Sequence, residues 1–171
     1  MNGKFSIYFV LVLLVSCDSR NEYFNTLKLS ELTTKTNVVV VRTDFSNEYV
    51  WKQLCQEIKK PSKEGFMPYV DFLQDEQFKD VVPIQLLEML SADKNYDHSY
   101  FFVADALSIE HPEKPMMCVS MRKDLESLPT FRVTPNMLWV VENNLSISNL
   151  LFEEFFYSLD ADGILRNEGQ D

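Results

Sequence analysis

Two aspartates stand where acid–base or metal chemistry could occur, directly after segments that indicate buried strands. Asp44 lies just beyond the four valines at 38–41, and Asp105 follows the largely apolar segment at 99–104. Ligands of open parallel sheets bind beyond the carboxyl ends of the strands, so two carboxylates in one crevice could hold a divalent ion or act as acid and base. A hydrolase of this kind requires the two carboxylates to lie within about 10 Å of each other, because both must reach one ligand.

The alternative for these aspartates is structural. Asp44 and Asp105 could cap local turns or helices, and Arg42 could pair with one of them. This alternative is favoured, because no phosphate-binding loop, nucleophile or third ligand accompanies the two carboxylates. With only four glycines, the chain has neither a dinucleotide-binding nor a P-loop fingerprint, so no cofactor is expected.

Histidine and cysteine give no stronger signal. His98 and His111 are the two histidines of the chain, and their spacing of 13 residues is not that of metal ligands, so no metal site is predicted. Cys55 falls on the apolar face of a predicted helix and Cys118 within a predicted strand, which indicates two core residues. Whether these two thiols form a disulfide or stay free is left open, since the sequence does not give the distance between them.

Polar and aromatic residues gather around a predicted connection between two helices near the C-terminus. They could bind a ligand, or their amides could satisfy the free backbone groups at the two helix ends, which is the favoured interpretation. The candidate binding residues of the whole chain are Arg42, Arg132, Trp139, Glu142, Asn143, Asn144 and Asn149.

The elements that position these residues follow from periodicity and capping. Helices are expected to begin after Ser46, at Pro83 and after Ser148 or Asn149, each with an apolar stripe, and a further helix at Pro135, ending at 142–144. The alternation of helices and strands predicts an α/β fold, a single domain with a mixed, mostly parallel sheet and helices on both faces. The predicted strands are 37–43, 69–73, 99–105, 116–121, 130–133 and 164–166.

The start of the chain resembles a bacterial lipoprotein leader. One lysine precedes a nearly uninterrupted apolar run of 11 residues at 5–15, whereas about 20 residues are needed to span a bilayer. The letters LVSC at 14–17 resemble a lipobox. The resemblance implies a signal peptide at 1–16, acyl chains on Cys17, a tether at 17–36 and a place in the bacterial cell envelope, with the membrane as a partner. The alternative is an ordinary secretory signal with a coincidental cysteine.

The charge balance restricts the class of partner. The 171 residues include 26 acidic and 16 basic side chains, which gives a formal net charge of -10. Because phosphate backbones need a basic surface, a nucleic acid is not expected as a partner. A basic protein partner would fit this charge, although a net negative charge more commonly indicates only a solvated acidic surface.

Several strings of the chain resemble a bacterial family known only as a domain of unknown function. The resemblance covers about residues 37–167, with the α/β domain placed at 37–168, and it implies no activity and no functional residue. The strings are VVRTDF at 40–45 followed by Trp51, FFVAD at 101–105, FRV at 131–133, Trp139 with ENNLS at 142–146, Asn149, Phe155 and the Asp-Gly pair at 162–163.

The sequence supports three functional hypotheses. The first is a membrane-anchored, non-enzymatic protein-binding domain, of which a toxin-neutralising immunity protein is one example, by analogy with other small acidic domains. The second is an envelope hydrolase that uses Asp44 and Asp105. The third is an accessory lipoprotein with a purely structural role. The lipobox, the acidic charge and the lack of a catalytic motif favour the first hypothesis.

Overall fold

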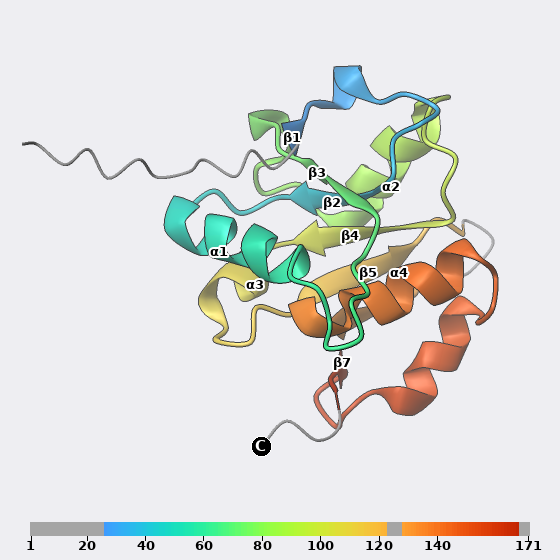
Figure 1. Ribbon diagram of the computed structural model, residues 1–171. Coiled ribbons are helices and arrows are strands. Elements are labelled where there is room, and N and C mark those ends of the chain that lie inside the picture. The colour runs from blue at the N-terminus through green and yellow to red at the C-terminus, as the bar shows by residue number, and fades with distance from the viewer. Residues whose placement is uncertain (1–25, 123–127, 168–171) are drawn as a thin grey trace, which may run out of the picture.

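The computed structural model describes residues 26–122 and 128–167, which form one seven-stranded sheet with helices packed against it (Figure 1). Every strand predicted from the sequence is present, within one residue of its expected bounds. The strands are β1 (Thr26–Leu27), β2 (Val38–Arg42), β3 (Val70–Leu73), β4 (Tyr100–Ala104), β5 (Met116–Ser120), β6 (Thr130–Val133) and β7 (Ile164–Leu165). The α-helices are α1 (Glu48–Ile58), α2 (Pro83–Ala92), α3 (Ala106–Glu110) and α4 (Leu138–Ser146), and the 3-10 helices are η1 (Leu29–Glu31), η2 (Glu76–Phe78), η3 (Pro135–Met137) and η4 (Phe152–Ser158).

The sheet is mixed and mostly parallel, which confirms the predicted α/β class. In the order β1-β3-β2-β4-β5-β6-β7, neighbouring strands run parallel except in the β4–β5 and β5–β6 pairs. β2 lies between β3 and β4, and its register pairs Val40 with Phe102 and Arg42 with Ala104. The chain passes from β2 through α1 to β3, and from β3 through α2 to β4, on the other side of β2. The carboxyl ends of β2 and β4 therefore form the switch point of the sheet, where such folds bind ligands.

The valines of β2 belong to two hydrophobic cores, one on each face of the sheet. Val38 and Val40 lie in the core that includes residues of α1, α3, α4 and η4, whereas Val39 and Val41 lie in the core that includes residues of η2 and α2. Figure 1 shows α1 and α4 in front of the sheet and α2 behind it. All four valines are at most 1% exposed, and full burial of each stabilises the fold by about 1.5–3 kcal/mol. Helices thus cover both faces, as predicted.

The start of α1 differs from the prediction by one residue. Asn47, rather than Ser46, caps the helix, because its side-chain oxygen accepts a hydrogen bond from the N–H of Val50 at 3.1 Å. Ser46 instead donates both its N–H and its hydroxyl to Asp44 Oδ1. Since the turn at Asp44 engages Ser46, the next residue with a side-chain oxygen becomes the cap.

The C-terminal helices also differ from the prediction. α4 continues to Ser146 instead of ending at 142–144, and the chain then turns at Ser148, whose backbone is left-handed with a φ of 55°. The N–H groups of Ser148 and Asn149 donate to carbonyl groups of α4, so both residues close that helix rather than cap the next one. The next helix is η4, which has Leu151 at its N-cap.

Residues 26–36 belong to the folded domain, so the predicted tether is wrong for this part of the chain. β1 pairs in parallel with β3 at one edge of the sheet. Leu32 is 4% exposed within the core on the α2 face, and the side-chain amide of Asn95 donates to its carbonyl at 3.0 Å. Residues 1–25, with the predicted signal peptide and Cys17, lie outside the described residues. Within the described ranges, no helix has the length and apolar character needed to cross a membrane.

Candidate functional site

The switch point brings the two aspartates of the hydrolase hypothesis to one edge of the sheet. Because β2 and β4 are parallel neighbours and Arg42 is in register with Ala104, Asp44 and Asp105 both follow strands that end at this edge. The N–H groups of Thr43 and Asp44 donate to the carbonyl of Ala104 at 2.9 and 3.4 Å. The chemistry of this edge then depends on which groups already engage the two carboxylates.

Asp44 is held in a turn. Its Oδ1 atom accepts hydrogen bonds from the hydroxyl of Ser46 and from the N–H of Ser46, the second at 2.8 Å. A bond between an aspartate side chain and the backbone two residues further on is the usual contact of an Asx turn. The carboxylate of Asp44 thus shapes the connection from β2 to α1.

Asp105 caps α3 and pairs with Arg132. Its Oδ1 atom accepts from the N–H of Ser108 at 3.2 Å and from Arg132 Nη1 at 3.1 Å, and its Oδ2 atom accepts from Arg132 Nη2. Burial raises the pKa of this carboxyl, but the contacts with Arg132 and Ser108 outweigh burial, so the pKa lies below its ordinary value. An ionised carboxylate engaged in this way is a poor general acid. The geometry therefore fits the capping alternative better than the hydrolase hypothesis.

Arg42 pairs with Glu48 and with neither aspartate carboxylate, which corrects the predicted pairing. Its Nη1 atom lies 2.7 Å from Glu48 Oε2, and its Nε–H donates to the backbone carbonyl of Asp44 at 2.9 Å. The turn at Asp44 presents this carbonyl, not the carboxylate, to the guanidinium. The guanidinium also lies over the rings of Phe45 and Trp51, at 4.4 and 5.1 Å from their centroids. Arg42 is 1% exposed, so it joins β2 to α1 rather than offering a free charge to a ligand.

Exposed aromatic residues lie where the loop between α1 and β3 meets α4. The ring of Phe66 stacks on Trp139 of α4, with ring centroids 4.9 Å apart and an interplanar angle of 13°. Phe66, Met67 and Tyr69 are nevertheless 54%, 47% and 75% exposed. Asn143, also exposed, lies four residues after Trp139 and so on the same side of α4. We define these five residues as the α4 surface.

Glu142 joins this loop to α4 on the buried side of the helix. It is 5% exposed, its Oε2 atom accepts from the N–H of Tyr69 at 3.1 Å, and its Oε1 atom accepts from the hydroxyl of Ser146 at 2.9 Å. The hydroxyl of Tyr100 in β4 donates to the backbone carbonyl of Glu142 at 3.0 Å and lies 2.9 Å from Ser146 Oγ. Both carboxylate oxygens therefore have a donor, which offsets the cost of burying them.

The amides of Asn144 and Asn149 close the end of α4. Asn144 Nδ2 donates to the carbonyl of Val140 at 2.8 Å, and Asn149 Nδ2 donates to Asn144 Oδ1 at 2.6 Å. The N–H of Asn149 also donates to the carbonyl of Asn144 at 2.9 Å. These contacts match the interpretation that the amides satisfy helix ends. Of the candidate binding residues in α4, Trp139 and Asn143 face the surface.

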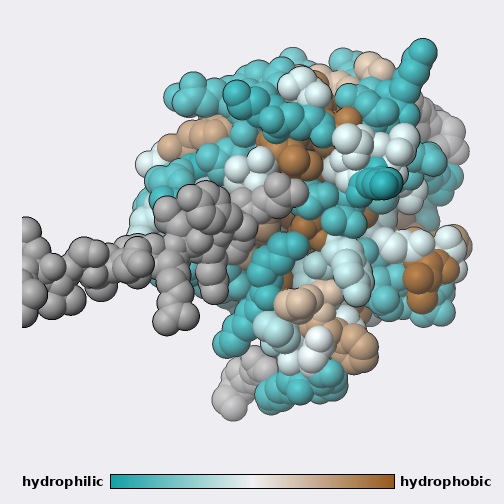
Figure 2. All heavy atoms as spheres, turned by 45° about the horizontal axis from the view of Figure 1, so that its top comes forward, coloured by the Kyte–Doolittle hydropathy of each residue, from teal (hydrophilic) through white to brown (hydrophobic). Residues whose placement is uncertain are grey.

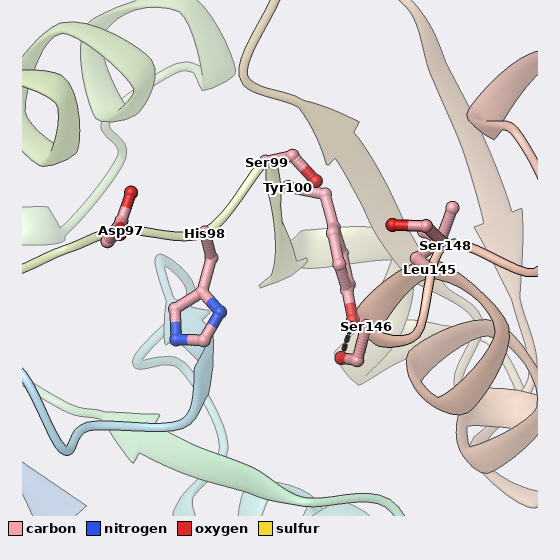
Figure 3. A pocket seen from close by; sticks show the side chains of 7 residues that line it. All are labelled: Asp97, His98, Ser99, Tyr100, Leu145, Ser146 and Ser148. Carbon is pink, nitrogen blue, oxygen red and sulfur yellow. Dashed lines mark hydrogen bonds between the residues drawn. The ribbon is translucent and has the colours of Figure 1, made fainter.

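A polar pocket of about 420 Å³ lies at the C-terminal end of α4 (Figure 3). Figure 3 shows Tyr100 between the two segments that form the pocket, with its hydroxyl bonded to Ser146. The sequence marks only one side of this pocket, because Leu145 and Ser146 belong to the ENNLS string at 142–146, whereas the segment at 97–100 is distant in the chain and carries no motif. The lining residues are Asp97, His98, Ser99 and Tyr100 on the segment that enters β4, and Leu145, Ser146 and Ser148 at the end of α4.

The cysteines and histidines do not form a reactive centre in the part of the chain that the structure describes. Cys55 and Cys118 are both free and buried. They therefore do not form the disulfide that the sequence left open. Burial raises the pKa of each thiol, which keeps it protonated and unreactive. No group of three or more His, Cys, Asp or Glu side chains among the described residues is placed to hold a metal ion.

Comparison with family models finds a match over residues 37–168 to the family described as Domain of unknown function (DUF6924). Comparison with curated proteins and with solved structures gives no match. The matched segment runs from β2 to β7, so it includes the switch point, the α4 surface and the pocket, whereas β1 and η1 precede it. Because the match covers well over half of the 171 residues, the chain belongs to the DUF6924 family of domains of unknown function.

Proposed function

We propose that this chain is a non-enzymatic protein-binding domain that contacts its partner through the α4 surface. The exposed aromatic cluster on that surface is the observation that carries the proposal, since Phe66 and Tyr69 are 54% and 75% exposed and Met67 lies between them at 47%. Aromatic and methionine side chains are enriched in protein interfaces, where a few of them supply most of the binding energy.

The loop that carries the cluster is held against α4 before any partner binds. Phe66 is stacked on Trp139, and the backbone of Tyr69 is held by the buried carboxylate of Glu142. A held ring and a held loop backbone lose less conformational entropy on binding than mobile ones, which favours affinity. The α4 surface is therefore better suited to docking a partner than a loose loop of the same composition.

The charge of the chain favours a basic partner. The formal net charge is -10. Figure 2 shows a face of the molecule on which hydrophilic residues predominate and hydrophobic residues gather in small patches. A basic protein attracted by the acidic field and then held by an apolar contact fits this combination.

The lipobox supports a membrane anchor for this binding domain. A lipid on Cys17 would place the domain in the bacterial cell envelope, and the nine peptide steps from Cys17 to Thr26 in β1 would allow a separation of at most roughly 30 Å. Incorporation of labelled palmitate, abolished by Cys17→Ser, is the expected result, and an unlabelled wild-type chain would contradict the anchor. An immunity protein that neutralises a toxin would combine an anchor and a binding surface, by analogy of domain type.

Affinity capture from a lysate of the source cells tests the proposed function, with the full chain in mild detergent as bait at low and moderate salt. Tyr69→Ser removes an aromatic ring from the α4 surface, and Tyr157→Ser makes the same change on η4, where Tyr157 is 91% exposed. We expect one stoichiometric partner that survives moderate salt and binds at least about tenfold more weakly to Tyr69→Ser, as for the loss of an interface hot spot. Tyr157→Ser should bind as the wild type does.

Two results would contradict the proposed function. One is the capture of no protein at either salt concentration. The other is a partner that tolerates both tyrosine substitutions, or is lost equally with both, because the α4 surface would then have no special part in binding.

A further inference from the structure

We infer that the pocket at the C-terminal end of α4 receives a lysine side chain of the partner protein. The inference rests on the proposed function and adds to it the chemistry of one contact. It is carried by the hydrogen-bonding groups that line the pocket, by the position of the pocket at the end of α4 and by the size of the cavity.

The pocket presents acceptors and one negative charge. Asp97 contributes a carboxylate at the rim, and Ser99, Ser146 and Ser148 contribute hydroxyl oxygens. Neither lysine nor arginine occurs among the described residues that line it. Within the described chain, the side chains of Asp97, Ser99 and Ser148 make no hydrogen bond, so a ligand can engage them without breaking an internal contact.

His98 adds another acceptor. Its Nε2 atom lies 2.9 Å from the backbone carbonyl of Thr36, and since a carbonyl only accepts, Nε2 carries the hydrogen. In the neutral ring the other nitrogen, Nδ1, is then an acceptor. Figure 3 shows one ring nitrogen of His98 turned towards the side of the pocket where Tyr100 lies.

A lysine side chain matches both the size and the lining. The volume of about 420 Å³ falls within the range of ligand sites, about 300–1,000 Å³. An ammonium group donates up to three hydrogen bonds and accepts none, and its aliphatic stem requires an apolar wall, which Leu145 supplies beside Tyr100. A guanidinium is better served by the paired oxygens of a carboxylate, and among the lining residues only Asp97, at the rim, has them.

The pocket and the α4 surface lie along one side of the same helix. Trp139, Asn143 and Ser146 follow one another at intervals of four and three residues, which keeps them on one helical face over about 10 Å. Glu142 connects the two regions, because it accepts from Tyr69 in the loop and from Ser146 at the pocket. A partner that lies along α4 can therefore contact the aromatic cluster and place a lysine in the pocket.

Titration of the isotope-labelled full chain with two tripeptides, followed by NMR, tests the inference. Gly-Lys-Gly carries the ammonium, and Gly-norleucine-Gly has a side chain of similar length without it. We expect the lysine peptide to shift the amide signals of 97–99 and 146–148 in a saturable way, and the norleucine peptide to leave them unchanged. Equal shifts with both peptides, or none with the lysine peptide, would overturn the inference.

A charge-matched pair of variants makes the test specific. Asp97→Asn should weaken binding of Gly-Lys-Gly about threefold, the size expected for an exposed ion pair. Glu110→Gln removes the same charge from an exposed residue of α3, beyond the opposite end of β4, and should leave binding unchanged. Equal affinities of Asp97→Asn and the wild type, or equal weakening in both variants, would overturn the inference.

Two further outcomes distinguish this inference from a site for free diamines and from the proposed function. If 1,4-diaminobutane bound at least tenfold more tightly than Gly-Lys-Gly, the pocket would be a site for free diamines and the lysine assignment would be wrong. If capture of the protein partner were lost with Tyr69→Ser but unaffected by Asp97→Asn, the lysine contact would be wrong while the proposed function would stand.

Discussion

Glu142 connects two segments that are far apart in the sequence. Its carboxylate accepts from the N–H of Tyr69, 73 residues away, and from the hydroxyl of Ser146 at the next turn of α4. The same buried side chain thus positions the loop that carries Phe66 and one wall of the pocket. This single buried acceptor therefore holds the loop and the helix of the α4 surface together.

Replacing Glu142 should therefore be costly for stability. We expect Glu142→Ala to lower the free energy of unfolding by about 1–3 kcal/mol, because two donors lose their acceptor. Urea unfolding followed by tryptophan fluorescence measures the change. Glu110→Ala alters an exposed glutamate of α3 and should change stability by no more than about 0.5 kcal/mol. Similar losses in the two variants would show that the Glu142 contacts do not hold the loop.

The pair formed by Asp105 and Arg132 predicts sensitivity to acid. The pKa of Asp105 is lowered in the folded chain, whereas an aspartate in the unfolded chain has a pKa of about 4. The stabilisation is therefore fully present above about pH 4 and is lost as the pH falls through the lower folded pKa. We expect the stability of the wild type to fall more steeply below about pH 4 than that of Asp105→Asn, measured by urea unfolding at several pH values. Parallel pH profiles would contradict this role.

The first turn of α1 allows a test of which residue caps the helix. Asn47→Ala should lower the free energy of unfolding by about 1 kcal/mol, because the side-chain oxygen that accepts from Val50 N–H is removed. Ser46→Ala, at the residue that the sequence favours as the cap, should cost less, since its bonds to Asp44 are exposed to water. Chemical denaturation of both variants checks the order, and a larger loss for Ser46→Ala would assign the cap to Ser46.

The larger elements could be predicted because their signals are local. Four consecutive valines require cover on both faces of β2, and Pro83 begins α2 as expected. β1 and the burial of Leu32 could not be predicted, because the two-residue pairing with β3 and the packing of Leu32 depend on segments distant in the sequence. η4 carries the expected buried residues Phe152 and Phe155, but the apolar stripe does not distinguish a 3-10 helix from an α-helix.

The candidate site could be predicted only in part, for the same reason. Asp44 and Asp105 lie at one edge because β2 and β4 are parallel neighbours, and the pattern of strands predicts this edge only if the two strands are adjacent. Their engagement by Ser46 and by Arg132 depends on side-chain directions that only the folded chain fixes. The polar and aromatic residues near the C-terminus gave one sequence signal, which includes Trp139 of the α4 surface and Ser146 of the pocket. The loop residues of the α4 surface and the pocket residues at 97–100 had none.

At the scale of the whole molecule, the folded domain begins earlier than the family match. The match starts at residue 37, but β1 and Leu32 belong to the sheet and to one core. We expect a chain that begins at residue 37 to be less stable by at least about 2 kcal/mol than one that begins at residue 26, as for the loss of a buried leucine. Thermal and urea unfolding of the two chains measure the difference. Equal stabilities would show that residues 26–36 do not contribute to the stability of the domain.

The most direct test of the binding role is hydrogen–deuterium exchange of the chain alone and in complex with its captured partner. Binding through the α4 surface predicts slower exchange in 62–69 and 138–148, with unchanged exchange in η4 and in α3. Slower exchange confined to the switch point, at 43–48 and 105–115, would contradict the proposed interface. That result would favour a functional site at the two aspartates at the carboxyl ends of β2 and β4.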